Sequence, residues 1–181
     1  MSLLIVSSCS PSTAPLDMKF PNALYSGNVS DLYEVIGSAS SVDLSWKDSN
    51  GIVRKLSGYH GKVAIVTFWQ SSLGASDTEI ASLDSAAREM PDSLRAIGIA
   101  TDNVTFGIGS FRTVLNYVTT HPIKLQVIVD STGLAQSEFP AQTRGTPQSF
   151  VLDTTGSVVA IWDGYFNRFE IDSSVRSIYG R

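Results

Sequence analysis

The sequence predicts an α/β fold with a central mixed sheet flanked by helices and an added N-terminal β-hairpin. Residues 63–69 form an apolar run of strand length, rich in β-branched and aromatic residues, which suits a strand buried on both faces. A loop of small residues and a helical pattern follow directly, as in the strand–loop–helix units of α/β proteins. Further along the chain, strand and helix patterns continue to alternate, which favours a layered α/β domain.

The composition is that of one globular domain with a tail. The chain has 181 residues, of which 43% are hydrophobic and 17% are charged. A formal charge of −4 argues against non-specific nucleic-acid binding, so no nucleic-acid partner is expected. No apolar run approaches the roughly 18 residues of a membrane span. We predict an N-terminal segment and linker over residues 1–41 and one domain over residues 42–181.

Cysteine and histidine are too few for most redox or metal chemistry. Cys9 is the only cysteine, so the chain has no Cys-x-x-Cys pair, no intrachain disulfide and no cysteine-based metal cluster. His60 and His121 lie far apart in sequence without the spacing of zinc ligands. We therefore expect neither a metal nor a cofactor.

The N-terminal segment resembles the lipobox of bacterial lipoproteins. An aliphatic run over residues 3–6, two serines and Cys9 precede a stretch rich in serine and proline. The resemblance implies that Cys9 carries lipid and that residues 10–41 form a tether, so that acyl chains replace a membrane helix as anchor. The alternative is an ordinary free cysteine. Within the tether, residues 30–36 show a short helical pattern.

The domain begins with a predicted hairpin of strands 42–46 and 52–56, joined by a turn. After the central strand, periodicity predicts a helix that begins at Ser76 or Asp77 and ends near Met90, followed by a strand over residues 95–100. A second helix carries Phe111, Val114, Leu115 and Val118 on one face and ends at His121 and Pro122. The last predicted elements are a strand over residues 125–129, a hairpin around residues 154–156 and a helix over residues 167–178. Asp130 and Asp153 are interpreted as turn residues at strand ends.

From about residue 42 onward the chain resembles the thioredoxin-like superfamily, especially bacterial envelope thiol–disulfide oxidoreductases and peroxiredoxin-like redoxins. In those families a strand ending in Phe-Trp is followed by Cys-x-x-Cys and a helix with an early glutamate. Here Phe68, Trp69 and Glu79 are in register, but Leu73 and Ser76 occupy the two cysteine positions. The peroxidatic cysteine of peroxiredoxins also aligns with Ser76.

The chemistry of the two replaced positions argues against catalysis. A helix N-terminus makes a cysteine thiolate available near neutral pH, whereas leucine has no such chemistry and serine needs a general base. His60 should lie at the opposite end of the central strand, and His121 should point away. Ser76 with Glu79 three residues later instead fits a capping box. The alternative interpretation of Glu79 is a residue that tunes the environment of the former thiol.

The surviving parts of the site predict a surface for peptides. The resemblance implies that Thr146-Pro147 is a cis-proline pair whose backbone pairs with a substrate strand, or that it only shapes the fold. Trp69 is either a core residue or the aromatic wall of a groove. We expect Trp69, Thr146, Pro147 and the loop 70–75 to converge on an apolar patch at Leu73, edged by Ser71, Ser72 and Ser76.

Three functional hypotheses follow. The preferred one is a redox-inactive thioredoxin-like binding or assembly module, exported and lipid-tethered in the bacterial cell envelope, with an envelope protein or peptide as partner. The alternative is a thiol–disulfide oxidoreductase or peroxidase-family protein that borrows a partner's cysteine. A third is a purely structural part of a larger complex. Contact with the membrane is expected only through the lipid anchor at Cys9.

Overall fold

The computed structural model describes residues 32–38, 43–48, 50–102, 110–130, 134–139 and 146–180. Cys9 and the first part of the predicted tether lie outside these residues, so the lipobox remains a prediction. Among the described helices, none combines the length and the hydrophobicity that a membrane crossing requires.

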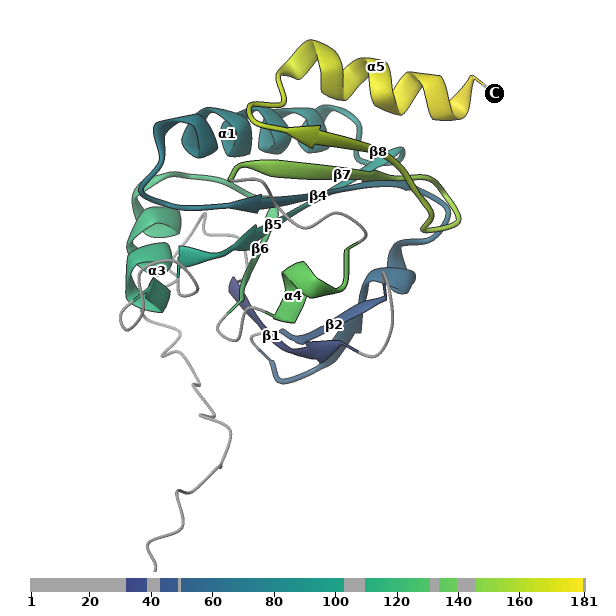
Figure 1. Cartoon of the computed structure of the whole chain (residues 1–181). Helices are drawn as coiled ribbons and strands as arrows, with labels where there is room; N and C mark the ends of the chain where they lie inside the picture. Colours follow the sequence, from purple (N-terminus) through teal and green to yellow (C-terminus); the bar gives the residue numbers. More distant parts are fainter. Residues whose placement is uncertain are drawn as a thin grey trace, which may run out of the picture.

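The described strands form one sheet in the order β3-β2-β1-β6-β5-β4-β7-β8 (Figure 1). β4 (Val63–Trp69) lies between β5 (Leu94–Ala100), which is parallel to it, and β7 (Gln148–Leu152), which is antiparallel. β6 (Gln126–Val129) extends the parallel side, and β8 (Val158–Asp163) closes the antiparallel side. Every residue of β4 is buried, which confirms the prediction of a central, covered strand.

The predicted hairpin is present as β2 (Leu44–Lys47) and β3 (Val53–Lys55), which pair antiparallel. Its turn is held by Asp48, whose Oδ1 accepts hydrogen bonds from the backbone N–H groups of Asn50 and Ile52, each at 2.9 Å. A carboxylate that accepts from nearby backbone amides is a common way to close a turn.

The helix expected over residues 30–36 is wrong, because Leu32–Ser38 forms strand β1. β1 pairs antiparallel with β2 and parallel with β6, so it joins the hairpin to the central strands. Its apolar residues have helical rather than alternating spacing, but Tyr33, Val35 and Ile36 suit a strand, and pairing with β2 and β6 decides for the strand. β1 therefore lies ahead of the domain boundary predicted at residue 42.

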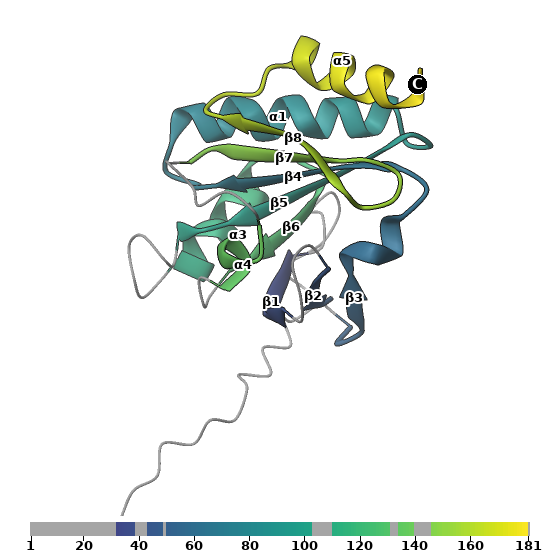
Figure 2. The same cartoon turned by 45° about the vertical axis from the view of Figure 1, so that its right-hand side comes forward.

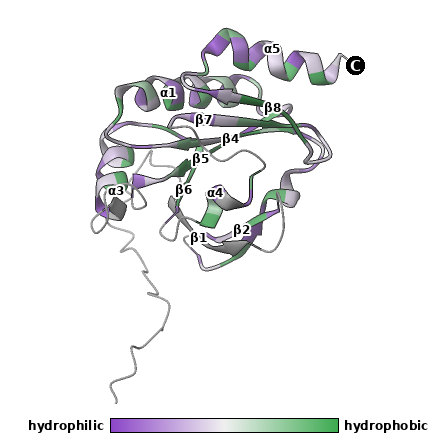
Figure 3. Ribbon diagram, viewed as in Figure 1, coloured by the Kyte–Doolittle hydropathy of each residue, from purple (hydrophilic) through white to green (hydrophobic). Residues whose placement is uncertain are grey.

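Helices cover the sheet on both faces (Figures 1 and 2). One apolar core lies between the sheet and three helices: α1 (Gly74–Glu89), α3 (Ser110–Thr120) and α5 (Arg168–Tyr179). The other core is closed by the short helices η2 (Leu56–Tyr59) and α4 (Leu134–Ser137) together with β2. Along α1 and α5, hydrophilic and hydrophobic residues alternate as expected for helices with one buried side (Figure 3).

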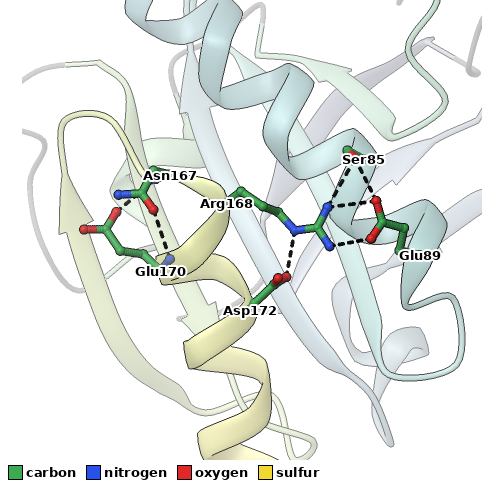
Figure 4. A network of polar contacts seen from close by, with 6 residues as sticks. All are labelled: Ser85, Glu89, Asn167, Arg168, Glu170 and Asp172. Atoms are coloured by element: carbon green, nitrogen blue, oxygen red, sulfur yellow. Dashed lines mark hydrogen bonds and ion pairs between the residues drawn. The ribbon is translucent and has the colours of Figure 1, made fainter.

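Polar contacts fix α5 against α1 (Figure 4). Arg168 donates to Glu89 of α1 at 2.8 Å and to Asp172 one turn further along α5, also at 2.8 Å. α5 begins with a capping box in which Asn167 and Glu170 satisfy each other's backbone amides. The predicted final helix is thus confirmed, with a well-defined first turn.

Candidate functional site

The two positions that align with cysteines lie between β4 and α1, but they differ in exposure. Leu73 is half-buried and is the N-cap residue of α1, where no side chain caps the helix. Ser76 is fully buried in the first turn. Its Oγ accepts a hydrogen bond from the backbone N–H of Gln70 at 3.3 Å, so the hydroxyl holds the loop against the helix. Ser76 therefore cannot edge a surface patch.

The predicted capping box of Ser76 and Glu79 is wrong, because α1 begins at Gly74, ahead of the expected start. This earlier start places Ser76 inside the helix rather than at its N-cap. Its hydroxyl then reaches back to the preceding loop, and Glu79 is free to point elsewhere.

The side chain of Glu79 on α1 points into the protein, toward β7 and the segment that follows β8. Its side chain is fully buried; Oε1 accepts from the Ser149 hydroxyl, and Oε2 accepts from the Phe166 backbone N–H at 3.1 Å. Ser149 Oγ is also 2.6 Å from Thr67 Oγ1. Burial raises the pKa of Glu79 from 4.5 to about 7, and the hydrogen bonds of Ser149, Phe166 and Thr67 oppose that shift only in part. Glu79 is thus a buried carboxyl poised between its two protonation states at neutral pH.

Trp69 is a core residue, because its side chain is fully buried at the end of β4. Its ring packs on Tyr117 of α3 with a centroid distance of 4.9 Å. The indole also lies against Gly98: a Cβ atom at this position would be only 2.9 Å from Nε1 of Trp69. Any residue larger than glycine would therefore collide with the indole. An aromatic wall of an open groove, the second interpretation of Trp69, does not fit this burial.

The Thr146–Pro147 pair stands at the same edge of the sheet as the β4–α1 loop. Its peptide bond is cis, in keeping with the resemblance. Phe68 lies opposite Gln148 in the β4–β7 pairing, so Thr146 and Pro147 precede β7 just where Trp69 and the loop end β4. Thr146 is half-buried, whereas Pro147 is buried and its carbonyl accepts from Gly164 N–H at 2.9 Å. Of this pair, Thr146 is the better placed to meet a ligand.

Acidic residues that follow β5 and β6 complete this edge. Asp102 is buried, and its carboxylate accepts from the Ser71 hydroxyl and from the Ser71 N–H at 3.1 Å. Asp130 accepts from Ala135 N–H at 3.0 Å and so orders the start of α4. Our sequence reasoning missed Asp102, although an aspartate two residues after a parallel strand is a signal that points to this edge.

Neither histidine supplies a base to Ser76 within the described part of the chain. The ring of His60 lies against Gly156 in the β7–β8 turn, at the far end of the sheet, as expected. His121 stacks on Tyr117 at 4.1 Å, and its Nε2 is 3.8 Å from Asp77 Oδ1 in the first turn of α1. Since Ser76 Oγ is occupied by a backbone amide, this contact gives no nucleophile–base pair.

Metal-binding chemistry has no obvious location either. Over the described ranges, no group of three or more histidine, cysteine, aspartate or glutamate side chains is arranged to hold a metal ion. The polar groups of the site, Ser71, Asp102, Ser76 and Glu79, instead bind one another or the backbone. These contacts order the loop at the sheet edge.

A family model described as AhpC/TSA family matches residues 38–161. The chain belongs to the AhpC/TSA family. Its fold and motif order are thioredoxin-like, as the sequence predicts. Among curated proteins, none matches this chain significantly.

Solved structures with the same fold are distant in sequence. An exposed lipoprotein thioredoxin (Etrx1) from Streptococcus pneumoniae is 20% identical, with a TM-score of 0.64, 75% of this chain covered and 98% of that one. A thioredoxin-family thiol:disulfide interchange protein from Chlorobium tepidum is 19% identical, with a TM-score of 0.59 and coverages of 84% and 99%. A secreted disulfide oxidoreductase from Mycobacterium tuberculosis is 16% identical, with a TM-score of 0.61 and coverages of 76% and 97%. At these identities the likeness concerns the fold.

Proposed function

We propose that this AhpC/TSA-family chain is a redox-inactive thioredoxin-like binding or assembly module of the bacterial cell envelope. One observation carries the proposal: the position of the second cysteine holds Ser76, buried and hydrogen-bonded to the Gln70 amide. A serine hydroxyl without a base is a poor nucleophile, and Leu73 has no reactive group. The fold is kept while the sulfur chemistry is lost, which suits a protein that binds rather than reacts.

The proposed location is the envelope, with Cys9 lipidated. The lipobox-like order of residues before Cys9 supports it, as do relatives of the same fold that are described as secreted or as an exposed lipoprotein. A single acyl chain binds membranes only marginally, so a firm anchor requires more than one. Mass spectrometry of Cys9 in the native protein tests this part of the proposal; an unmodified thiol would refute it.

The purified protein is expected to show no thiol–disulfide activity. In an insulin-reduction assay driven by a small dithiol, adding the protein should leave the rate at the dithiol background, because no cysteine lies at the site. Thiol-dependent peroxide consumption should also stay at background. The Cys9→Ser variant is the control for stray reactivity of the one thiol. Acceleration that survives Cys9→Ser would contradict the proposal.

A second candidate function, catalysis with a partner's cysteine, is favoured by Glu79. Its buried carboxyl, with a pKa near 7, could exchange a proton at neutral pH. The same assay decides: if the candidate is right, a cysteine-bearing partner will be reduced or oxidised faster in the presence of the chain, and Glu79→Gln will remove the gain. If the module only binds, Glu79→Gln will have no effect on rate.

We place the binding surface at the side chain of Leu73 and at the backbone of Thr146. Of the four residues predicted to bind a peptide, Trp69 and Pro147 are buried, and Leu73 and Thr146 are half-buried. Ser76, which was expected at the rim of the patch, is buried too. The binding surface is therefore smaller than the sequence predicts. An extended peptide would pair with the backbone of Thr146 and contact the Leu73 side chain.

Replacing Leu73 by aspartate is expected to weaken capture of the partner about tenfold, equivalent to about 1.4 kcal/mol. Because Leu73 is the N-cap residue and aspartate is a favoured N-cap, the variant should remain folded. Ser72→Asp is the matched control, since it adds the same charge one residue away and keeps Leu73. Binding is measured by quantitative crosslinking in native envelopes. Equal losses in both variants, or no loss in Leu73→Asp, would place binding elsewhere.

A further inference from the structure

A hollow of about 360 Å³ lies at the amino ends of β5 and β6, at the opposite end of the sheet from the β4–α1 loop. Tyr59 of η2, Arg88 of α1, Arg95 of β5, Lys124 and Gln126 contribute its polar lining. This hollow is independent of the proposed function, because it shares no residue with the binding surface around Leu73.

Two cations in this hollow have no acidic partner in the described part of the chain. Ile97 lies opposite Gln126 in the parallel β5–β6 pairing. Arg95 and Lys124 each lie two residues before this pair, and both line the hollow. Both side chains are exposed, and no ion pair joins either of them to a described carboxylate. Like charges held side by side favour a bound anion.

The one acidic group of the hollow, Asp84, is already fully used. Its Oδ1 accepts the backbone N–H groups of Lys124 at 2.6 Å and Leu125 at 2.7 Å. Its Oδ2 binds the guanidinium of Arg88, which also donates to the Pro122 carbonyl at 3.0 Å. Asp84 therefore neutralises Arg88 and leaves Arg95 and Lys124 uncompensated.

Gln126 adds a buried donor that lacks an acceptor. Its Oε1 accepts from the hydroxyl of Tyr59, whose ring is stacked on Trp46 with a centroid distance of 6.2 Å. Burial raises the pKa of Tyr59, so this hydroxyl stays protonated and remains the donor. The Nε2 of Gln126 is buried and has no acceptor among the described residues. Buried amides are normally satisfied, so this unpaired donor would gain an acceptor if the Gln126 side chain turned toward the hollow that it lines.

We propose that this hollow is a binding site for a small oxyanion group, a phosphate or a carboxylate. Arg95 presents a planar fork of donors that matches either group, and Lys124 adds a second positive charge. The side chain of Gln126 also lines the hollow, and a turn toward the ligand would bring Nε2 to one of its oxygens. The volume exceeds that of a single phosphate, so the group would belong to a small organic molecule. The hollow is open to solvent, so binding is weak to moderate.

Titration of the full chain with inorganic phosphate and, separately, with succinate tests the proposal. Two-dimensional NMR follows the side-chain amide of Gln126, and sodium chloride at equal ionic strength is the reference. We expect a saturable shift of that amide with at least one of the two anions and none with chloride. Tighter binding of phosphate would assign the site to phosphorylated ligands, and tighter binding of succinate to carboxylates.

Arg95→Gln and Lys124→Gln are each expected to weaken binding about tenfold, or about 1.4 kcal/mol. Both side chains are exposed and unpaired, so these variants should fold. Arg176→Gln on α5 is the matched control, because it removes an exposed arginine outside the hollow and should bind as the parent does. A shift that does not saturate, that chloride reproduces, or that Arg176→Gln weakens as much as Arg95→Gln would overturn the proposal.

Discussion

Replacing Asp84 by alanine is expected to lower the free energy of unfolding by about 3 kcal/mol, because two backbone donors lose their acceptor at about 1–3 kcal/mol each. Asp84 is buried on α1, and its Oδ1 holds the N–H groups of Lys124 and Leu125, where the chain enters β6. The truncated side chain would leave the Leu125 amide buried without a partner. The contact therefore does more than pair Asp84 with Arg88: it ties α1 to the start of a strand.

Equilibrium unfolding in urea measures this loss, and two variants separate its causes. Asp84→Asn keeps an oxygen for the two amides but gives up the charge that faces Arg88, so its loss should be clearly smaller. Asp172→Ala removes the carboxylate of the half-buried pair with Arg168 but leaves no buried backbone amide without an acceptor, so it should cost no more than about 1 kcal/mol. If Asp84→Ala were no more damaging than Asp172→Ala, the backbone contacts would not carry the stability assigned to them.

Local sequence patterns predicted most strands of the sheet. They failed for β1, whose secondary structure depends on pairing with strands that are distant in sequence. β4 was recognisable because all of its positions but Thr67 are apolar, which is typical of a strand covered on both faces. Leu32–Ser38 has residues that suit a helix as well as a strand. Its choice depends on β2 and β6, and β6 begins almost a hundred residues later.

The candidate site shows the same limit. The spacing of Ser76 and Glu79 fits a capping box, but it fits equally well a residue inside the helix and a carboxyl that points into the core. Ser149 and Phe166, which bind Glu79, are 70 and 87 residues away in sequence, so no local pattern could announce them. Conversely, the absence of any cysteine after Cys9 was visible in the sequence alone, since it depends only on residue identity.

Glu79 is expected to make the protein less stable as the pH rises through neutrality. Its pKa is about 7 in the folded protein and close to 4.5 when exposed in the unfolded chain. Between these values the folded state binds more protons than the unfolded state, so the free energy of unfolding falls as pH increases. The stabilising contribution is complete below about pH 4.5 and lost above about pH 7; from about pH 5 to about pH 8 it falls by about 2–3 kcal/mol.

Glu79→Gln isolates this effect from other titrating groups. The glutamine carbonyl can accept from Phe166 N–H while its amide donates to Ser149 Oγ, which reproduces the contacts of the protonated acid. The stability of the variant relative to the parent should therefore increase between about pH 5 and about pH 8, by the same 2–3 kcal/mol or so. Glu138→Gln is the control, because the Glu138 side chain makes no hydrogen bond to a described residue. Its stability relative to the parent should not change over this pH range. A constant difference between Glu79→Gln and the parent across this range would mean that Glu79 is ionised in the folded protein. In that case the hydrogen bonds from Ser149, Thr67 and the Phe166 amide would have to offset the whole cost of removing the carboxylate from water.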